Sequence, residues 1–90
     1  MKNEKLHLLL EQLHQELDEI ENMDEKDLEM LKTLETNISG VLSKTDKGQP
    51  VDHPNIIQQV ERSIDYFEFT HPTLSATLVK LLTVLGNAGI

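Results

Sequence analysis

The apolar residues of the N-terminal half fall into two stripes with helical spacing. The first stripe recurs after four, three, four and three residues, with mostly polar side chains between, and consists of Leu6, Leu10, Leu13, Leu17 and Ile20. The second consists of Leu28, Leu31, Leu34, Ile38, Val41 and Leu42 and ends near Lys44. Asp24, followed by two more acidic residues, is a suitable N-terminal cap for the second helix. The short turn between them predicts an antiparallel helical hairpin over residues 3–44.

The C-terminal half predicts further helices after a break. Residues 45–53 contain Gly48 and Pro50, show no periodicity and predict an exposed linker. A third helix begins near Pro54, and its stripe consists of Ile57, Val60, Ile64 and Phe67, with Ile56, Tyr66 and Phe69 expected to widen it. Proline disfavours the α conformation in the residue before it and suits the first position of a helix. His71 and Pro72 therefore predict a structural junction, either a bend in one helix or a break between two, within helices over residues 54–85.

The last helix is apolar on more than one side. Its seam is Leu74, Leu78, Leu81 and Leu85, while Val79, Leu82 and Val84 lie off the seam and Lys80 is its single charge. Because one neighbouring helix cannot cover this much apolar surface, we expect helix four to be both central in the bundle and an interface between copies of the chain. The residues expected there are Leu74, Leu78, Val79, Leu81, Leu82, Val84, Leu85 and Ile90. In the tail, residues 86–90, either Ile90 docks in an apolar groove or the terminus is frayed.

The expected fold class is all-α: one helical domain over residues 1–90, built as antiparallel helical hairpins of three to four helices. Ninety residues bury a modest share of their surface, and the absence of cysteine excludes disulfide bonds as an added source of stability. Association with another chain is the source that remains. We therefore expect a coiled-coil-like bundle completed by oligomerisation into a dimer or tetramer.

Charge narrows the range of partners. Sixteen acidic residues against eight basic ones give a net charge of −8, which disfavours binding to nucleic acid. Residues 1–47 contribute −6 of that charge, so the first hairpin is the more solvated half. The first eleven residues are charged and already periodic, without a signal-peptide core, which favours a cytoplasmic location. Helix four is short and interrupted by polar residues, so no membrane span is expected.

Two groups of residues suggest chemistry. Glu4 with His7, and Glu11 with His14, have the spacing of ligand pairs in di-iron bundles, but both pairs lie on one helix and outside its seam, which favours solvated surface. A zinc ion held between copies by these histidines is a weaker alternative. The second group is His71 with its neighbours Glu68 and Tyr66. These could form a site for a small molecule or metal inside the bundle, or an enzymatic one, although no recognisable nucleophile and base accompany them.

Other chemistries lack support in the sequence. Acidic pairs such as Asp18 and Glu19 belong to a charge-rich turn and would need burial to act as a catalytic dyad. There is no glycine-rich phosphate loop, and Arg62 is the single arginine, too few cations for an enzyme of chorismate mutase type. We expect no catalytic residues, no cofactor and no metal.

Three short segments resemble a known family. They are Leu10 to Leu17 with the pattern Leu-x-x-Leu-His-Gln-Glu-Leu, His71-Pro72-Thr73-Leu74, and the closing Leu85-Gly86-Asn87-Ala88-Gly89-Ile90. Through them the chain resembles the bacterial family known as domain of unknown function 4404 over nearly its whole length. The resemblance implies a stand-alone bacterial protein of about this size without an assigned activity. It adds no catalytic residues.

The leading hypothesis is therefore a non-catalytic, homo-oligomeric helical scaffold or adaptor that can bind an unidentified protein partner. The alternative is a small-molecule or metal-binding bundle with a site near His71. A third hypothesis, an acidic mimic of nucleic acid, has less support because many of the acidic residues occupy ordinary solvent-facing positions.

Overall fold

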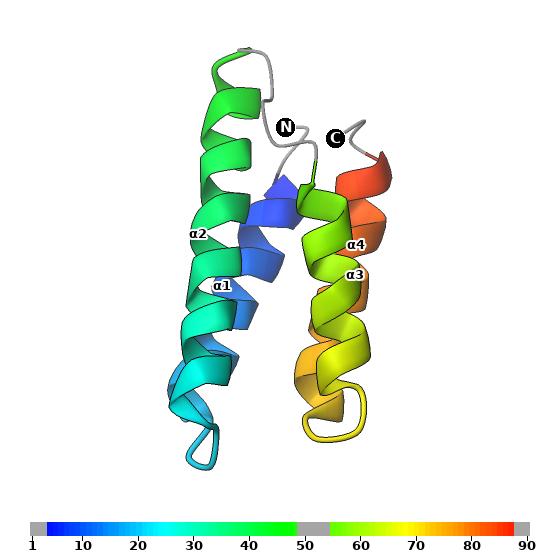
Figure 1. Cartoon of the computed structure of the whole chain (residues 1–90). Coiled ribbons are helices and arrows are strands. Elements are labelled where there is room, and N and C mark those ends of the chain that lie inside the picture. The colour runs from blue at the N-terminus through cyan, green and yellow to red at the C-terminus, as the bar shows by residue number, and fades with distance from the viewer. Residues whose placement is uncertain (1–3, 49–54, 88–90) are drawn as a thin grey trace.

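Apart from its turns, the described part of the chain folds as helices only, as the periodicity predicts. The computed structural model describes residues 4–48 and 55–87, and within these ranges it contains four helices and no strand. The helices are α1 (Glu4–Glu19), α2 (Glu25–Asp46), α3 (Ile56–Phe67) and α4 (Pro72–Asn87). Figure 1 shows that each helix runs antiparallel to the one before it, so the two predicted hairpins are present.

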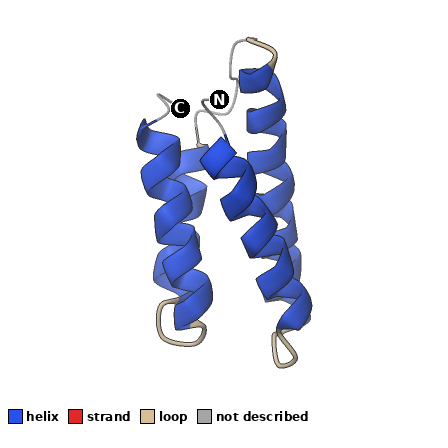
Figure 2. Ribbon diagram, turned by 180° about the vertical axis from the view of Figure 1, so that it is seen from behind, coloured by secondary structure: helices blue, strands red, loops and turns tan. Residues whose placement is uncertain are grey.

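The four helices form a closed ring in which each contacts two others. α1 packs against α2 and α4, and α3 packs against α2 and α4. The turns within the two hairpins lie at one end of the molecule, here called the turn end, and the ends of α1 and α4 nearest the chain termini lie at the other. Seen from behind, the two hairpins diverge toward the turn end (Figure 2). The result is an elongated four-helix bundle measuring 39 × 21 × 19 Å.

Every helix contributes apolar side chains to the core. The buried apolar residues are Leu6, Leu13, Leu17, Leu31, Leu34, Ile38, Val41, Leu42, Ile56, Val60, Phe67, Leu74, Leu78, Leu81 and Leu85. Leu10, Ile20 and Leu28, also expected on the first two stripes, are half-buried against this cluster. The seams of α1, α2 and α4 therefore face inward as their spacing predicts.

The stripe of α3 differs from the expected one. Ile56, Val60, Ser63 and Phe67 are buried, whereas Ile57 and Ile64 are half-buried. The expectation that Tyr66 and Phe69 widen the apolar stripe is wrong, since their exposed fractions are 58% and 90%. Ser63 occupies a buried position at the centre of this seam, where a large apolar residue would be expected. Its hydroxyl donates to the carbonyl of Gln59 at 2.9 Å, so the serine is buried without an unpaired polar group.

Backbone hydrogen bonds define the two turns at the turn end. The carbonyl of Asp24, the residue before α2, accepts the N–H of Leu28 at 3.0 Å. Between α3 and α4, the N–H of His71 donates to the carbonyl of Phe67 at 2.9 Å, and the carbonyl of His71 accepts the N–H of Ser75 at 3.0 Å. His71 thus links the last turn of α3 to the first turn of α4, and these are two helices and not one bent helix.

Two helix ends lie beyond their expected positions. α2 continues to Asp46, two residues into the predicted linker, before Gly48 adopts a φ of 70°. α4 passes through Gly86 and ends at Asn87. Residues 49–53 of the linker, and Ile90 with its expected docking, lie outside the described residues. Within the described residues, no helix has the length and apolar character that a membrane span requires.

Candidate functional site

Four of the eight residues expected at an interface between copies lie inside the chain's own core. These are Leu74, Leu78, Leu81 and Leu85, which are at most 2% exposed. Leu78 is covered within one subunit, because α1 and α3 pack on either side of α4 and cover its seam. Val79 remains 45% exposed, and Leu82 and Val84 are half-buried. An interface between copies itself stays a prediction.

The remaining surface of α4 is defined here as the α4 outward face, and it consists of Ala76, Val79, Lys80 and Thr83, flanked by Leu82 and Val84. α4 contains no acidic residue, so Lys80 is the charge of this face. The hydroxyl of Thr83 donates to the backbone carbonyl of Val79 at 3.0 Å, so this polar group is paired within its own helix. The α4 outward face is thus made mostly of small and apolar side chains, and the hydroxyl of Thr83 needs no hydrogen-bond partner from another molecule.

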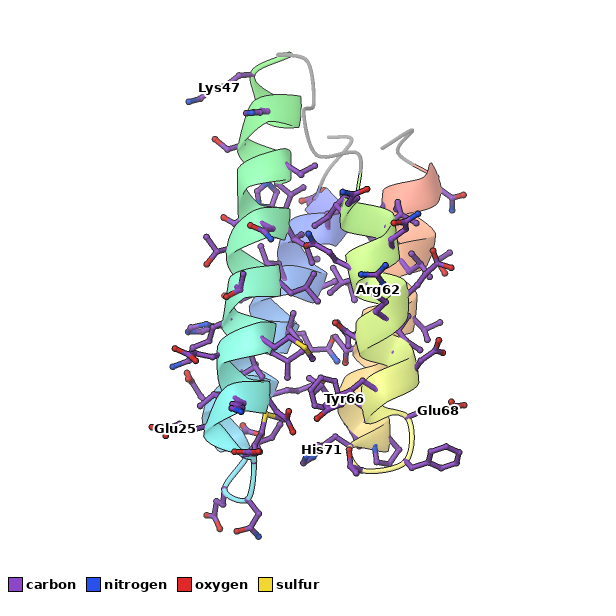
Figure 3. All side chains as sticks on the ribbon, in the orientation of Figure 1. Glu25, Lys47, Arg62, Tyr66, Glu68 and His71 are labelled. Carbon is purple, nitrogen blue, oxygen red and sulfur yellow. The ribbon has the colours of Figure 1, made fainter. Side chains whose placement is uncertain are left out.

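A second candidate surface lies where the hairpins diverge. A hollow of about 300 Å³ opens between the end of α1 and the start of α4. It is lined by Glu16, Glu19, Ile20, Thr70, His71, Pro72, Thr73 and Leu74. His71, which the sequence associates with Glu68 and Tyr66, therefore shares this hollow with two carboxylates of α1. Figure 3 shows that Glu68 points away from His71, on the opposite side of the turn.

Electrostatics explain why carboxylates suit this position. Glu16 and Glu19 occupy the last turn of α1, where negative charge is unfavourable to that helix's own dipole. α4 has no acidic residue in its own first turn, and its positive end lies beside these same carboxylates. The first hairpin therefore supplies the negative charge that the start of α4 lacks.

One side-chain network fixes α1 to α4 above the hollow. The buried hydroxyl of Thr77 lies 2.8 and 2.9 Å from the two carboxylate oxygens of Glu16, and it donates its proton to them. Gln12 donates to Glu16 at 3.0 Å and to the Thr77 hydroxyl at 3.4 Å. A hydrogen bond to a carboxylate is stronger than one between neutral groups, so this contact holds Glu16 at the edge of the hollow.

Tyr66 joins the hairpins on the other side of the bundle. Its hydroxyl donates to the carboxylate of Asp27 on α2 at 2.9 Å, and its ring packs edge-on against Phe67 with centroids 4.8 Å apart. The hydrogen bond to Asp27, and then the negative charge of that carboxylate, raise the pKa of Tyr66 above its ordinary value of 10.0. Tyr66 is thus engaged with α2 and does not line the hollow beside His71.

A second hollow, of about 320 Å³, lies between α2 and α3. It is lined by Met30, Thr33, Leu34, Asn37, Gln59, Arg62 and Ser63. The amide of Asn37 donates to Gln59 across it at 3.1 Å. Arg62, the single arginine, lies along this seam (Figure 3).

The histidine pairs of α1 lie on its exposed surface, as their flanking positions predict. His14 lies 2.8 Å from a carboxylate oxygen of Glu35 on α2 and 3.5 Å from Asp18. These contacts join α1 to α2 at the surface. In the described part of the chain, no three acidic or histidine side chains are grouped closely enough to hold a metal ion.

Sequence reasoning missed two features of the turn end. Nothing in the heptad pattern indicates that Glu16 and Glu19 meet the start of α4, because they are 53 or more residues away in the chain from Pro72. The exposure of Phe69 could have been suspected from its place next to the junction at His71, where a helical stripe cannot continue.

A comparison with models of protein families identifies the same family that the three short sequence segments resemble. The model of a protein family described as a domain of unknown function (DUF4404) matches residues 6–90. Comparisons with curated proteins and with solved structures found no match. Since the family model covers nearly the whole chain, including the turn end and α4, the chain belongs to the DUF4404 family.

Proposed function

We propose that this chain is a non-catalytic helical scaffold that associates with a second copy of itself through the α4 outward face. The observation that carries the proposal is the exposure of Val79 at 45% on a helix with no acidic residue. Leu82 and Val84, half-buried on its flanks, extend the apolar area to both sides. A monomer leaves this surface in water, and burying it against the same surface of another copy is favourable.

Charge favours the α4 outward face over the surfaces of α1 and α2 as the place where a second copy binds. α1 carries five acidic residues against one lysine, and α2 begins with acidic residues in its first turn. Two copies that meet through these helices would bring like charges together, whereas two α4 outward faces bring together only one lysine each. A two-fold arrangement uses the same patch on both copies, as most homodimers do.

The size of the face predicts a reversible equilibrium. A stable interface buries about 800 Å² on each partner, and the outward side of one 16-residue helix offers less than a full domain face. We therefore expect monomer and dimer to exchange, with a melting temperature that rises with protein concentration.

Sedimentation equilibrium over a range of concentrations tests the proposal. The wild-type mass should rise above 10.3 kDa with concentration, and Val79→Glu should hold the chain as a monomer. Met30→Glu is the matched control, because Met30 is 40% exposed and lies on α2, which does not contact α4. Wild-type chain that stays monomeric into the millimolar range would refute self-association. If Val79→Glu and Met30→Glu change the mass equally, the interface does not lie on the α4 outward face.

A cysteine scan locates the interface independently. The chain has no cysteine, so a single introduced thiol reports contacts between copies without interference. Ala76→Cys, Val79→Cys and Thr83→Cys should form disulfide-linked dimers under mild oxidation, and Met30→Cys should form them far more slowly. No difference in rate between these positions would count against the α4 outward face.

A further inference from the structure

The most exposed large apolar side chain of the described residues lies at the tip of the turn between α3 and α4. Phe69 is 90% exposed, while Phe67, two residues earlier, is fully buried and Tyr66 is bonded to α2. Packing within the chain therefore does not explain the presence of a phenylalanine at position 69. Phenylalanine, like the other aromatic residues, is enriched in protein interfaces relative to the rest of the surface.

The hollow beside the same turn adds a second kind of contact. Its apolar lining comes from Ile20, Pro72 and Leu74, and Glu16 and Glu19 contribute carboxylates to it. Lysine and arginine bury their aliphatic stems on apolar surface and keep their charged ends against carboxylates. The hollow thus fits one basic side chain of a partner.

Charge at the turn end selects the class of partner. Between Asp18 and Glu29 the chain has seven acidic residues, and Lys26 is the one basic residue. Asp65 and Glu68 add two carboxylates from the other hairpin. A phosphate backbone or a second copy of this acidic end would be repelled, whereas a cationic protein segment would be attracted over several ångströms.

We propose that the turn end docks a basic protein segment, in which arginine or lysine alternates with large apolar side chains. Phe69 packs among the apolar side chains of that segment, and one of its basic residues enters the hollow beside Glu16 and Glu19. This surface is separate from the α4 outward face, so the proposal does not depend on self-association.

Fluorescence anisotropy with labelled synthetic peptides tests it on the full chain. The probe is a short peptide of alternating arginine and leucine, compared with arginine–serine and glutamate–leucine peptides of equal length. The arginine–leucine peptide should bind most tightly, and its affinity should fall as salt is added. Phe69→Ser should weaken it about tenfold or more, the effect of losing one anchor residue.

Two further variants test whether binding depends on the charge at the hollow and on the position of the exposed apolar side chain. Glu19→Gln should weaken binding and reduce its dependence on salt, because one carboxylate at the hollow is lost. Leu8→Ser is the matched control: Leu8 is 60% exposed but lies on α1 toward the opposite end of the bundle, so binding should not change. All three variants alter exposed positions and should keep the wild-type circular dichroism spectrum.

Several outcomes would overturn the proposal. One is failure of the arginine–leucine peptide to bind, and another is equal binding to the wild type and Phe69→Ser. If the arginine–serine peptide binds as tightly as arginine–leucine, the attraction is general and Phe69 is not an anchor. If Phe69→Ser abolishes the concentration dependence of the mass, a second copy and not a basic segment occupies the turn end.

Discussion

Leu78 and Val79 are adjacent in the chain and have opposite surroundings. Leu78 is fully buried among the seams of the bundle, and Val79 is 45% exposed on the α4 outward face. The difference follows from the 100° rotation between successive helical residues, which turns one side chain inward and the next outward. Apolar character alone therefore does not separate the core of α4 from the surface that we propose as an interface.

Alanine substitutions should distinguish these two positions. Leu78→Ala leaves a cavity in the core and should lower the free energy of unfolding by about 2–5 kcal/mol. Val79→Ala removes partly exposed methyl groups and should cost less than about 1 kcal/mol. Urea unfolding at low protein concentration, where association is weakest, measures both. Similar losses for the two variants would contradict the assignment of Leu78 to the core.

Tyr66 offers a test of the contact between α2 and α3. Its raised pKa means that the neutral hydroxyl, which donates to Asp27, is favoured in the folded state. The stabilising contribution is therefore complete below the unfolded value of 10.0 and is lost as the pH rises through the folded pKa. The native chain should become less stable at high pH for this reason.

The titration can be observed directly, because Tyr66 is the single tyrosine and there is no tryptophan. Ultraviolet absorbance should show Tyr66 ionising at a higher pH in the folded chain than in the urea-unfolded one. Asp27→Asn should lower the folded pKa of Tyr66 toward the ordinary value, since it weakens the hydrogen bond that the carboxylate accepts and removes its negative charge. Asp65→Asn, which removes a carboxylate that does not accept the Tyr66 proton, should change it less.

The longest helix, α2, contains a glycine in its interior and is followed by another. A Cβ added at Gly40 would meet no atom within 4 Å, so no neighbouring helix approaches closely at this residue. Gly48, after the end of α2, has a φ of 70°, a conformation that favours glycine. A side chain is therefore tolerated at Gly40 but strained at Gly48.

Replacing each glycine with alanine should change the free energy of unfolding in opposite directions. Gly40→Ala should raise the free energy of unfolding by about 0.5–1 kcal/mol, because it restricts the unfolded chain and favours the helix. Gly48→Ala should lower it by about 1 kcal/mol through backbone strain. Thermal unfolding followed by circular dichroism measures both changes. Destabilisation by Gly40→Ala would mean that α2 bends or packs closely at this point.

The hairpins meet through contacts of different kinds on the two sides of the bundle. On the α1–α4 side, the buried Thr77 and the half-buried Glu16 form a charge-assisted hydrogen bond. On the α2–α3 side, Asn37 with Gln59 and Tyr66 with Asp27 form exposed hydrogen bonds on a seam that also contains a hollow. Exposed polar contacts contribute less to stability than buried packing, so we expect the α2–α3 side to open first.

Net charge acts on the molecule as a whole. With a formal charge of −8 and seven acidic residues between Asp18 and Glu29, the turn end repels itself at low ionic strength. The melting temperature should therefore rise as sodium chloride is increased from a few millimolar to about 0.15 M, where charges farther apart than about 8 Å are screened. Differential scanning calorimetry at one fixed protein concentration measures this change. A melting temperature that falls with salt would show that favourable ion pairs dominate instead.

The spacing of apolar residues was sufficient for the helices and for most of the core. Heptad gaps identify the inward seams of α1, α2 and α4, because helical geometry alone decides which residues share a face. Proline at position 72 and aspartate at position 24 indicate the starts of α4 and α2 for local steric and hydrogen-bonding reasons. The stripe of α3 was less well predicted, since a buried serine replaces a large residue there.

The surfaces depended on contacts between distant parts of the chain. Glu16 and Glu19 meet the start of α4 only because the two hairpins close into a ring, and Phe69, which lies in the turn between α3 and α4, is 90% exposed because no helix of the bundle covers it. The sequence by itself therefore determined the elements, their directions and the inward seams of α1, α2 and α4, which arise from interactions within a few residues. Tertiary structure decided which parts of α4 remain open and what surrounds His71, because those properties depend on which helices pack side by side.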